Sequence, residues 1–430
     1  MASTRLQRNP SSAGTTEKGT LSVWVKRSSL NTNQNILTFV QGGSYLEIYF
    51  RENADTIRIY ATSHSATELY TNRKFRDTNG WYHIVVAIDS TQATASNRVK
   101  LYINGVQETS FSTANYPGQG NNMYINGGSG SINIGSLNPS GSQYFDGSMS
   151  HFHWIDGTAY DASAFGETDS TTGEWKIKTD VSVTYGTNGF FILKDGNSVT
   201  DQSGNSNNFT VGGGTLTKTE DCPSSVFATA NPLQQNSTIL TFTNGNNTVA
   251  EPSGNSASWT TRWGMSTLAF SSGKFYAEAK ISDIGSQQLY PIGIVRDEDI
   301  PGITSSVGTN GYGLYINDGR IIGFGNDIQT GLGSFSTNDI IGLAVDADNR
   351  TFQYYKNGST LGSQVTNITA GTYFFTSSAY ANHGIQFNFG NGYFGTTAVA
   401  SAGTNASGNG IFEYNCPAGY TALSTKGLNL

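Results

Sequence analysis

Residues 80–89 read GWYHIVVAID, and after a polar loop residues 98–106 read RVKLYINGV. The first run is apolar and rich in β-branched residues, which is typical of a buried strand. The second alternates apolar and polar residues, which predicts a strand with one buried and one solvated face. Asn104-Gly105 accepts positive φ at both central positions of a tight turn, so it predicts a hairpin and sets its register.

A second stretch repeats this order of features. Residues 341–346 read IGLAVD and residues 349–359 read NRTFQYYKNGS, which is again an apolar strand, an Asp, a short polar loop, a strand and Asn-Gly. Either an internal duplication or two separate β-sandwiches would explain the repeat. The spacing from Asp to Arg differs between the two stretches and their flanks do not align, so we favour two different sandwiches.

Length and composition indicate an all-β protein of two domains. A chain of 430 residues is too long for one ordinary core, and two domains of roughly 200 residues are expected. Glycine accounts for 52 of 430 residues, and charged residues make up 13%, about half of the usual share. Because the apolar residues occur in strand-sized runs, this composition predicts many strands and turns rather than disorder.

Charge and hydropathy argue against several classes of function. The formal net charge is −7, and no basic cluster is longer than Lys26-Arg27 or Arg73-Lys74, so we expect no nucleic-acid binding. No apolar run reaches eighteen residues, so we expect no membrane insertion. Residues 1–8 are polar and lack an apolar segment, so we expect no secretory signal.

The two cysteines, Cys222 and Cys416, cannot form a disulfide framework. Each precedes a proline, and they lie near the expected ends of the two domains. Domain termini are often close in space, so a single bridge is one alternative. Two reduced thiols are the alternative that we favour.

The strand pattern gives the following division of the chain. Residues 1–14 form a polar N-terminal arm, residues 15–220 form the first domain with a C-terminal extension, residues 221–235 form a linker, and residues 236–430 form the second domain.

The first domain resembles a known fold family. The segments LSVWVKR, GWYHIVVAID, VKLYINGV, INIGS and YFDGSMSHFHWIDGTAYDASAF are similar, in order and spacing, to the laminin-G-like, pentraxin-like group of concanavalin A-like lectin folds. The resemblance covers roughly residues 15–165 and implies a jelly roll of two antiparallel sheets. In this family, loops at one end often hold calcium. Asp89, Asp146 and Asp156 lie near such loops, but they do not supply the six to eight oxygen ligands that Ca²⁺ takes. We therefore expect a turn at Asp146-Gly147 and no cofactor.

Two further segments resemble phage proteins. Residues 201–211 (DQSGNSNNFTV), followed by residues 223–233 (PSSVFATANPL), look like the tail attached to laminin-G-like domains in virion proteins of tailed bacteriophages. Residues 8–30 are similar to the start of the same proteins. The resemblance implies a virion protein.

The second domain resembles a SPRY-like (B30.2-type) β-sandwich. The segments that carry the resemblance are SSGKFYAEAKI at 271–281, IGI at 292–294, GYGLY at 311–315, the hairpin at 341–362 and FNFGN at 387–391. Such sandwiches bind partner proteins or peptides through loops at one end, and the resemblance implies no catalysis.

Concanavalin A-like folds also include glycoside hydrolases, which need two carboxylates placed across a sugar. The alternating Glu-x-Asp-x-Glu pattern of such enzymes is absent, and Asp297-Glu298-Asp299 is best explained as a solvated loop. Among the histidines, His151 and His153 share one face of a strand, but no third metal ligand is placed. We therefore expect no catalytic residues and no metal site.

Aromatic residues beside polar loop residues are the candidates for ligand binding. Aromatic faces can stack on sugar rings or anchor protein contacts, and the alternative for each residue is packing in the core or at its rim. The candidates are Trp259, Trp263, Tyr290, Tyr312 and Tyr380.

Together these features predict two consecutive antiparallel β-sandwiches in a non-enzymatic phage virion surface protein. It would be a capsid decoration, a head fibre or a tail-fibre component that adheres to host-surface glycans. The chain lacks coiled-coil heptads, which favours a compact appendage. The alternatives are a carbohydrate-active enzyme and a free lectin or protein-binding module. We expect other virion proteins and host glycans as partners, a homo-oligomer such as a trimer, and a location on the virion surface.

Overall fold

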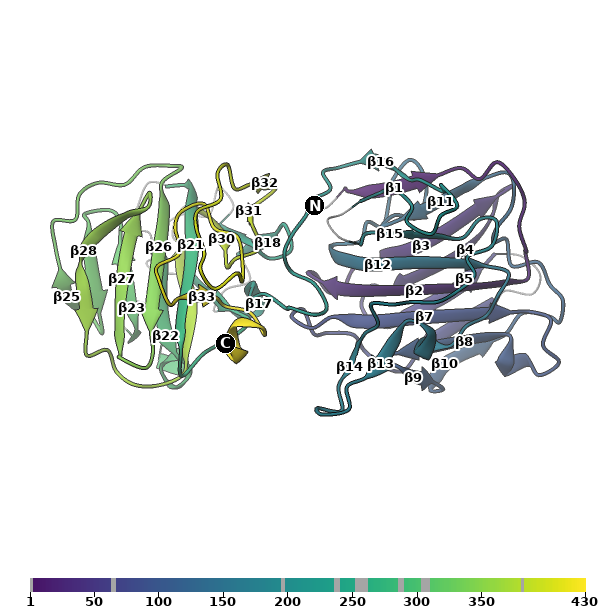
Figure 1. Cartoon of the computed structure of the whole chain (residues 1–430), viewed down its shortest axis with the longest axis horizontal. Coiled ribbons are helices and arrows are strands. Elements are labelled where there is room, and N and C mark those ends of the chain that lie inside the picture. The colour runs from purple at the N-terminus through teal and green to yellow at the C-terminus, as the bar shows by residue number, and fades with distance from the viewer. Residues whose placement is uncertain are drawn as a thin grey trace. The chain divides into compact units, whose positions relative to one another are not determined.

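The computed structural model describes residues 3–62, 67–194, 198–235, 240–251, 262–284, 290–302, 310–379 and 383–430. The chain divides into two compact units, residues 1–218 and residues 219–430. Within the described residues, regular structure consists of β-strands and short 3₁₀ helices, which confirms the all-β prediction (Figure 1). No helix in this part of the chain is long and apolar enough to cross a membrane.

The first unit is a sandwich of two antiparallel sheets. One sheet has the strand order β10 (Phe111–Asn115), β6 (Thr67–Thr71), β5 (Ile57–Ala61), β4 (Ser44–Phe50), β3 (Gln34–Gln41), β11 (Ser131–Ile134), β1 (Arg5–Arg8), β16 (Thr210–Gly213). The other has the order β15 (Phe190–Ile192), β12 (Gly147–Asp156), β2 (Lys18–Arg27), β7 (Tyr82–Asp89), β8 (Val99–Ile103), β9 (Val106–Glu108). The unit also contains the pair β13 (Gly166–Thr168) and β14 (Trp175–Ile177), with η1 (Ala95–Asn97) and η2 (Ala162–Ala164).

The predicted hairpin forms in the second of these sheets. β7 and β8 pair with Val86 opposite Leu101, and Asn104 and Gly105 turn the chain at φ values of 48° and 82°. A Cβ atom at Gly105 would lie 2.4 Å from the ring of Trp175, so this turn needs glycine for space as well as for its backbone angle. The hairpin is therefore structural.

The prediction of a polar N-terminal arm over residues 1–14 is wrong for residues 5–8. These residues form β1, which pairs with β11 on one side and with β16 on the other. Leu6 is buried in the core and supplies the apolar contact that holds the strand. A single buried residue in four gives too weak a pattern for sequence alone to identify such a strand.

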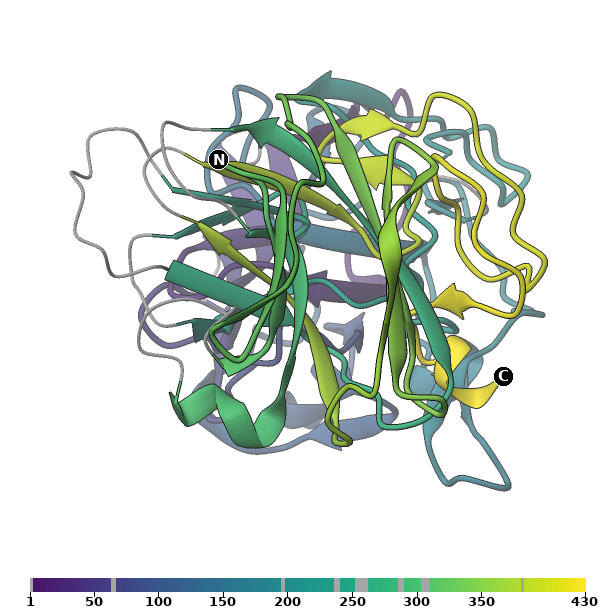
Figure 2. The same ribbon diagram turned by 90° about the vertical axis from the view of Figure 1, so that its left-hand side faces the viewer.

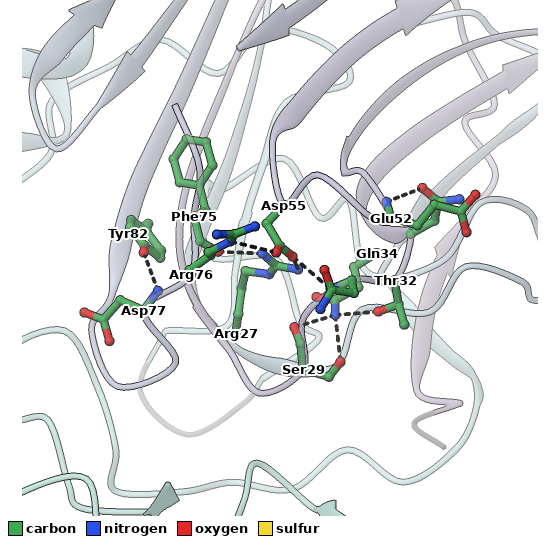
Figure 3. A network of polar contacts seen from close by, with 12 residues as sticks. Arg27, Ser29, Thr32, Gln34, Glu52, Asp55, Phe75, Arg76, Asp77 and Tyr82 are labelled. Atoms are coloured by element: carbon green, nitrogen blue, oxygen red, sulfur yellow. Dashed lines mark hydrogen bonds and ion pairs between the residues drawn. The ribbon is translucent and has the colours of Figure 1, made fainter. Parts of the chain in front are cut away.

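A buried ion pair links three separate segments of the first unit (Figure 3). The guanidinium of Arg27, at the end of β2, lies 3.1 Å from the carboxylate of Asp55, and both side chains are at most 1% exposed. Arg27 also donates to the carbonyl of Phe75, and the backbone N–H of Asn31 donates to Asp55. Burial lowers the pKa of Arg27, and the charge of Asp55 partly restores it. A paired, buried charge of this kind is costly to break.

The second unit is also a sandwich of two sheets. One has the order β17 (Ala230–Gln235), β20 (Arg262–Ser266), β29 (Tyr373–Ala379), β22 (Tyr290–Arg296), β23 (Tyr312–Tyr315), β24 (Arg320–Gly323), β25 (Asn326–Gln329). The other has the order β18 (Thr241–Thr243), β19 (Thr248–Ala250), β30 (Gly384–Asn388), β21 (Lys274–Asp283), β26 (Ile340–Asp346), β27 (Thr351–Lys356), β28 (Ser359–Thr366). The remaining elements are β33 (Thr421–Ala422), parallel to β21, the pair β31 (Tyr393–Phe394) and β32 (Thr397–Ala398), and the helices η3 (Asp297–Gly302) and η4 (Gly427–Asn429).

The second hairpin of the sequence, at residues 341–358, forms β26 and β27 of this unit. Its Asn357-Gly358 turn has φ values of 48° and 79°, close to those of the first hairpin. The two similar stretches thus lie in different sandwiches. The predicted linker over residues 221–235 is wrong, because Phe227 and Ala228 are buried and residues 230–235 form the edge strand β17.

The C-terminal segment covers the outer face of the sheet that contains β21, and Figure 2 shows this segment in yellow along one side of the second unit. Glu278 of β21, which is fully buried, accepts hydrogen bonds from the backbone N–H groups of Glu413 and Tyr414 at 2.8 and 2.9 Å. Burial raises the pKa of Glu278 to about 7, and these hydrogen bonds limit the rise. One carboxyl group therefore fastens the C-terminal segment to the sheet.

Cys222 and Cys416 are both free thiols. Cys416 is buried under the C-terminal segment, where desolvation raises the pKa of its thiol to about 12. A thiol in this state is a packing group and a poor nucleophile.

Candidate functional site

The outer face of β4, β5 and β6 in the first unit gathers tyrosine, arginine and glutamate side chains. On β4, the inward residues Leu46, Ile48 and Phe50 are fully buried in the core, so the alternate residues face outward. The same alternation holds on β5 and β6. We call this surface, together with Arg51 directly after β4, the tyrosine–arginine face; its residues are Tyr45, Glu47, Tyr49, Arg51, Arg58, Tyr60, Glu68 and Tyr70.

The strand register arranges these side chains in two cross-strand rows. One row places Glu47 opposite Tyr60 and Tyr60 opposite Glu68. The other places Tyr49 opposite Arg58 and Arg58 opposite Tyr70. Because neighbouring strands are about 5 Å apart, side chains within a row are in contact distance of one another.

Arg58 is the centre of the face. Its guanidinium carbon lies 3.9 Å from the ring centroid of Tyr60, and the group also stacks near the rings of Tyr49 and Tyr70. It donates hydrogen bonds to the hydroxyl of Tyr49 and to the carboxylate of Glu68, both at 2.5 Å. Burial lowers the pKa of Arg58, but these hydrogen bonds raise it overall. The arginine is a fixed cation that holds the tyrosine rings in place.

Arg51 and Glu68 occupy one end of the face. The Arg51 guanidinium carbon lies 4.3 Å from the ring centroid of Tyr70. Burial raises the pKa of Glu68, but hydrogen bonds from Tyr70 and Arg58 lower it overall, so this carboxylate is ionised. The face therefore carries two arginines and one firmly ionised carboxylate.

Glu47 is the more buried of the two carboxyl groups on the face. Its side chain is only 5% exposed, although it points away from the core. Burial raises its pKa to about 7, and the charge of Arg58 offsets this only in part. Within the described residues, the Glu47 carboxyl group makes no hydrogen bond and no ion pair. A buried carboxyl group with unused acceptors, set between tyrosine rings, is suited to a ligand that brings hydroxyl groups.

Of the five sequence-predicted ligand residues, the structure describes the side chains of two, Trp263 and Tyr312. Trp263 on β20 and Tyr312 on β23 are 4% and 8% exposed, so the prediction of exposed rings is wrong for both. Tyr312 packs edge-on against Phe352 in the core, and its hydroxyl accepts the N–H of Thr369. The backbone of Tyr290 belongs to β22. The Tyr290 side chain, Trp259 and Tyr380 lie outside the described residues.

Three aspartates lie near the loops that often hold calcium in the resembled family. Asp89 pairs with Lys18 at 3.5 Å and accepts hydrogen bonds from Thr91 and Gln92. Asp156 accepts backbone N–H groups on either side of β12. Burial raises the pKa of Asp146. In the part of the chain that the structure describes, no group of three or more His, Cys, Asp or Glu residues could hold a metal ion.

The histidine pair and the acidic triplet are also accounted for by packing. The pairing of β12 with β2 is irregular between Ser150 and His153, and His151 has a φ of 48°. His153 is buried, stacks 3.9 Å from Phe191 and bonds the hydroxyl of Tyr185. The triplet Asp297-Glu298-Asp299 starts η3 rather than a loop, and Arg296 pairs with Asp299 at 2.6 Å.

The sequence contained the signal for the tyrosine–arginine face. Residues 45–51 place Tyr, Glu, Tyr and Arg at alternate positions, and Arg58 and Tyr60 follow at the same period. Such alternation is typical of strands with one outward face, but it does not show which strands lie side by side. Only the pairing of β4 with β5 and β6 shows that these residues form one surface.

Family models match both units. The model described as "Concanavalin A-like lectin/glucanases superfamily" matches residues 3–162, and the SPRY domain model matches residues 274–392. No curated protein matches the chain.

Solved structures show low similarity. The SPRY domain of human HERC1 is 17% identical over 37% of this chain and 96% of its own, with a TM-score of 0.31. A heptameric SAP-like pentraxin from Limulus polyphemus is 15% identical over 37% of this chain and 72% of its own, with a TM-score of 0.29. Domain 4 of the arabinanase AbnA from Geobacillus stearothermophilus, in complex with arabinotriose, is 19% identical over 36% and 67%, with a TM-score of 0.27. Scores this low support no argument about function, whereas the two family models agree with the two sandwiches. The chain thus carries a concanavalin A-like domain followed by a SPRY domain.

Proposed function

We propose that the chain is a non-enzymatic surface protein of a tailed-phage virion that attaches to host-surface glycans through the tyrosine–arginine face. The observation that carries this proposal is the face itself. Tyr45, Tyr60 and Tyr70 are partly exposed on paired strands, with guanidinium and carboxyl groups between them. Flat rings stack on the apolar faces of sugars, and the polar groups bond their hydroxyls.

The rigidity of the face favours binding. Its residues lie on or directly beside hydrogen-bonded strands, and Arg58 fixes two tyrosines and one glutamate before any ligand arrives. A preorganised surface loses little conformational entropy on binding. Weak individual sites of this kind gain avidity when several copies are displayed on one particle.

The SPRY domain supplies the second contact in this proposal. SPRY-like domains bind proteins through loops at one end, so we assign it to other virion proteins, as part of a capsid decoration, head fibre or tail fibre. A homo-oligomer such as a trimer would present several tyrosine–arginine faces together. The phage assignment rests on the resemblance of residues 8–30, 201–211 and 223–233 to virion proteins.

One observation favours a second candidate, a glycoside hydrolase. Glu47 and Glu68 lie in the same cross-strand row about 10 Å apart at the backbone, and their pKa values are shifted in opposite directions, as for a general acid and a base. Binding without catalysis is favoured because the Glu68 carboxylate is already held by hydrogen bonds from Arg58 and Tyr70, which leaves it less able to act as a base.

Mass spectrometry of purified particles tests the virion assignment. We expect the chain in the particles at a copy number that matches a symmetry of the head or the tail. Particles that lack the chain would refute the virion role. In a second experiment, host polysaccharide is incubated with the pure protein. The polysaccharide should be bound without the appearance of new reducing ends, whereas release of reducing ends would favour the hydrolase.

A further inference from the structure

The polar groups that the tyrosine–arginine face leaves unused define the chemistry of its ligand. Glu47 is one of them. Its carboxyl group is buried beside Tyr60 and, within the described residues, has no donor. The Glu47 carboxyl oxygens are not sealed from the surface, so hydroxyl groups of a ligand can reach them and donate hydrogen bonds to them.

Arg51 is the other unused group. Its guanidinium stacks on Tyr70, and in the described part of the chain its side chain has no ion pair and no hydrogen bond. It attracts Glu68 by charge alone, and the Glu68 carboxylate is already bound by Arg58. A stacked guanidinium with free donors binds a carboxylate in a bidentate manner.

The charge balance points in the same direction. Arg51 and Arg58 carry two positive charges, and Glu68 compensates one of them. Glu47, with a pKa of about 7, compensates the second only in part near neutral pH. An anionic ligand therefore meets a surface with an uncompensated cation.

The distance between the two unused groups sets the size of the ligand. Glu47 and Arg51 are four residues apart along an extended chain, which corresponds to about 13 Å. Tyr49 lies between them on the same side of the strand. A single sugar ring is too short to reach both groups, whereas an oligosaccharide that follows β4 can contact both.

We propose that the ligand is an acidic oligosaccharide that lies along β4, with a uronic-acid carboxylate on Arg51 and sugar hydroxyls donating to Glu47. This inference rests on the proposed glycan binding and adds the chemical class of the glycan. It also assigns Arg51 and Glu47 as the residues that determine specificity.

Calorimetric titration of the full chain tests this with a panel of uronic-acid oligosaccharides, each compared with its own carboxyl-reduced form. The two forms differ in one group only, because the acidic form carries a carboxylate where the reduced form carries a primary alcohol. The acidic form should bind at least about tenfold more tightly, because a charge-assisted hydrogen bond contributes about 1.5–3 kcal/mol. Arg51→Gln should remove that difference, Glu47→Gln should weaken both forms, and Lys74→Gln, which removes an exposed charge outside the face, should change neither.

The proposal of an acidic ligand would be overturned if the acidic and reduced forms bound equally well, or if neither form bound. A preference for the acidic form that persists in Arg51→Gln would overturn the role of Arg51. The proposed adhesion is tested separately with polysaccharide extracted from the cells on which the particles grow. It fails if this polysaccharide also does not bind the wild-type chain.

Discussion

Replacing Asp55 with alanine should lower the free energy of unfolding of the first unit by about 3–5 kcal/mol. The substitution leaves the guanidinium of Arg27 buried with no counter-charge, and Arg27 has 0% of its side chain exposed. It also frees the backbone N–H of Asn31. Hydrogen exchange read by mass spectrometry should show faster exchange in β2, in β4 and around Phe75, with the second unit unchanged.

Two further variants separate the buried pair from surface charge. Arg76 also contacts Asp55, at 3.3 Å, but 54% of its side chain is exposed, so Arg76→Ala should cost less than about 1 kcal/mol. The double variant Arg27→Met/Asp55→Ala removes the lone charge and should recover part of the loss. If Asp55→Ala and Arg76→Ala have equal effects, the ion pair does not hold the unit together.

Replacing Glu278 with alanine should destabilise the second unit by about 2–4 kcal/mol. The substitution leaves the backbone N–H groups of Glu413 and Tyr414 without acceptors beneath the C-terminal segment. Exchange at residues 411–416 should increase first, because these residues lose their attachment to β21. Unchanged exchange there would show that apolar packing alone, around Phe412 and Tyr276, holds the segment.

The stability of the second unit should fall with rising pH because of the titration of Glu278. The pKa of Glu278 rises from its ordinary value of 4.5 to about 7 on folding, so the folded state disfavours the ionised form. The contribution of Glu278 to the free energy of unfolding is therefore fully present below about pH 4.5. It is lost as the pH rises to about 7, by up to about 3 kcal/mol. The variant Glu278→Gln has no carboxyl group to titrate at this position. The wild type should therefore lose stability relative to this variant between about pH 4.5 and pH 7.

Hydrophobic periodicity predicted the strands and hairpins, and the resemblance to known families implied their assembly into two sandwiches. Alternation over residues 99–103 and the Asn-Gly turns at 104–105 and 357–358 predicted both hairpins, because a period of two and a turn with positive φ leave few alternatives. The strands β1 and β17 were missed because each is a short strand stabilised mainly by its partners. Pairing with a distant segment leaves no local pattern.

The site was harder to predict for the same physical reason. Trp263 and Tyr312 stand beside polar residues in sequence, yet each packs inside the second unit. Neighbours in sequence alternate between the two faces of a strand, so a polar neighbour says little about burial. Glu47 and Tyr60, by contrast, are brought together by strand pairing alone.

Hydroxyl-radical footprinting of the full chain with bound host polysaccharide tests the central claim most directly. It measures the oxidation of each tyrosine side chain with and without ligand. Binding at the tyrosine–arginine face should protect Tyr45, Tyr60 and Tyr70, which are partly exposed in the free protein, and should leave Tyr393 of the second unit unchanged. Protection confined to aromatic residues of the second unit, with full oxidation of Tyr45, Tyr60 and Tyr70, would contradict the account.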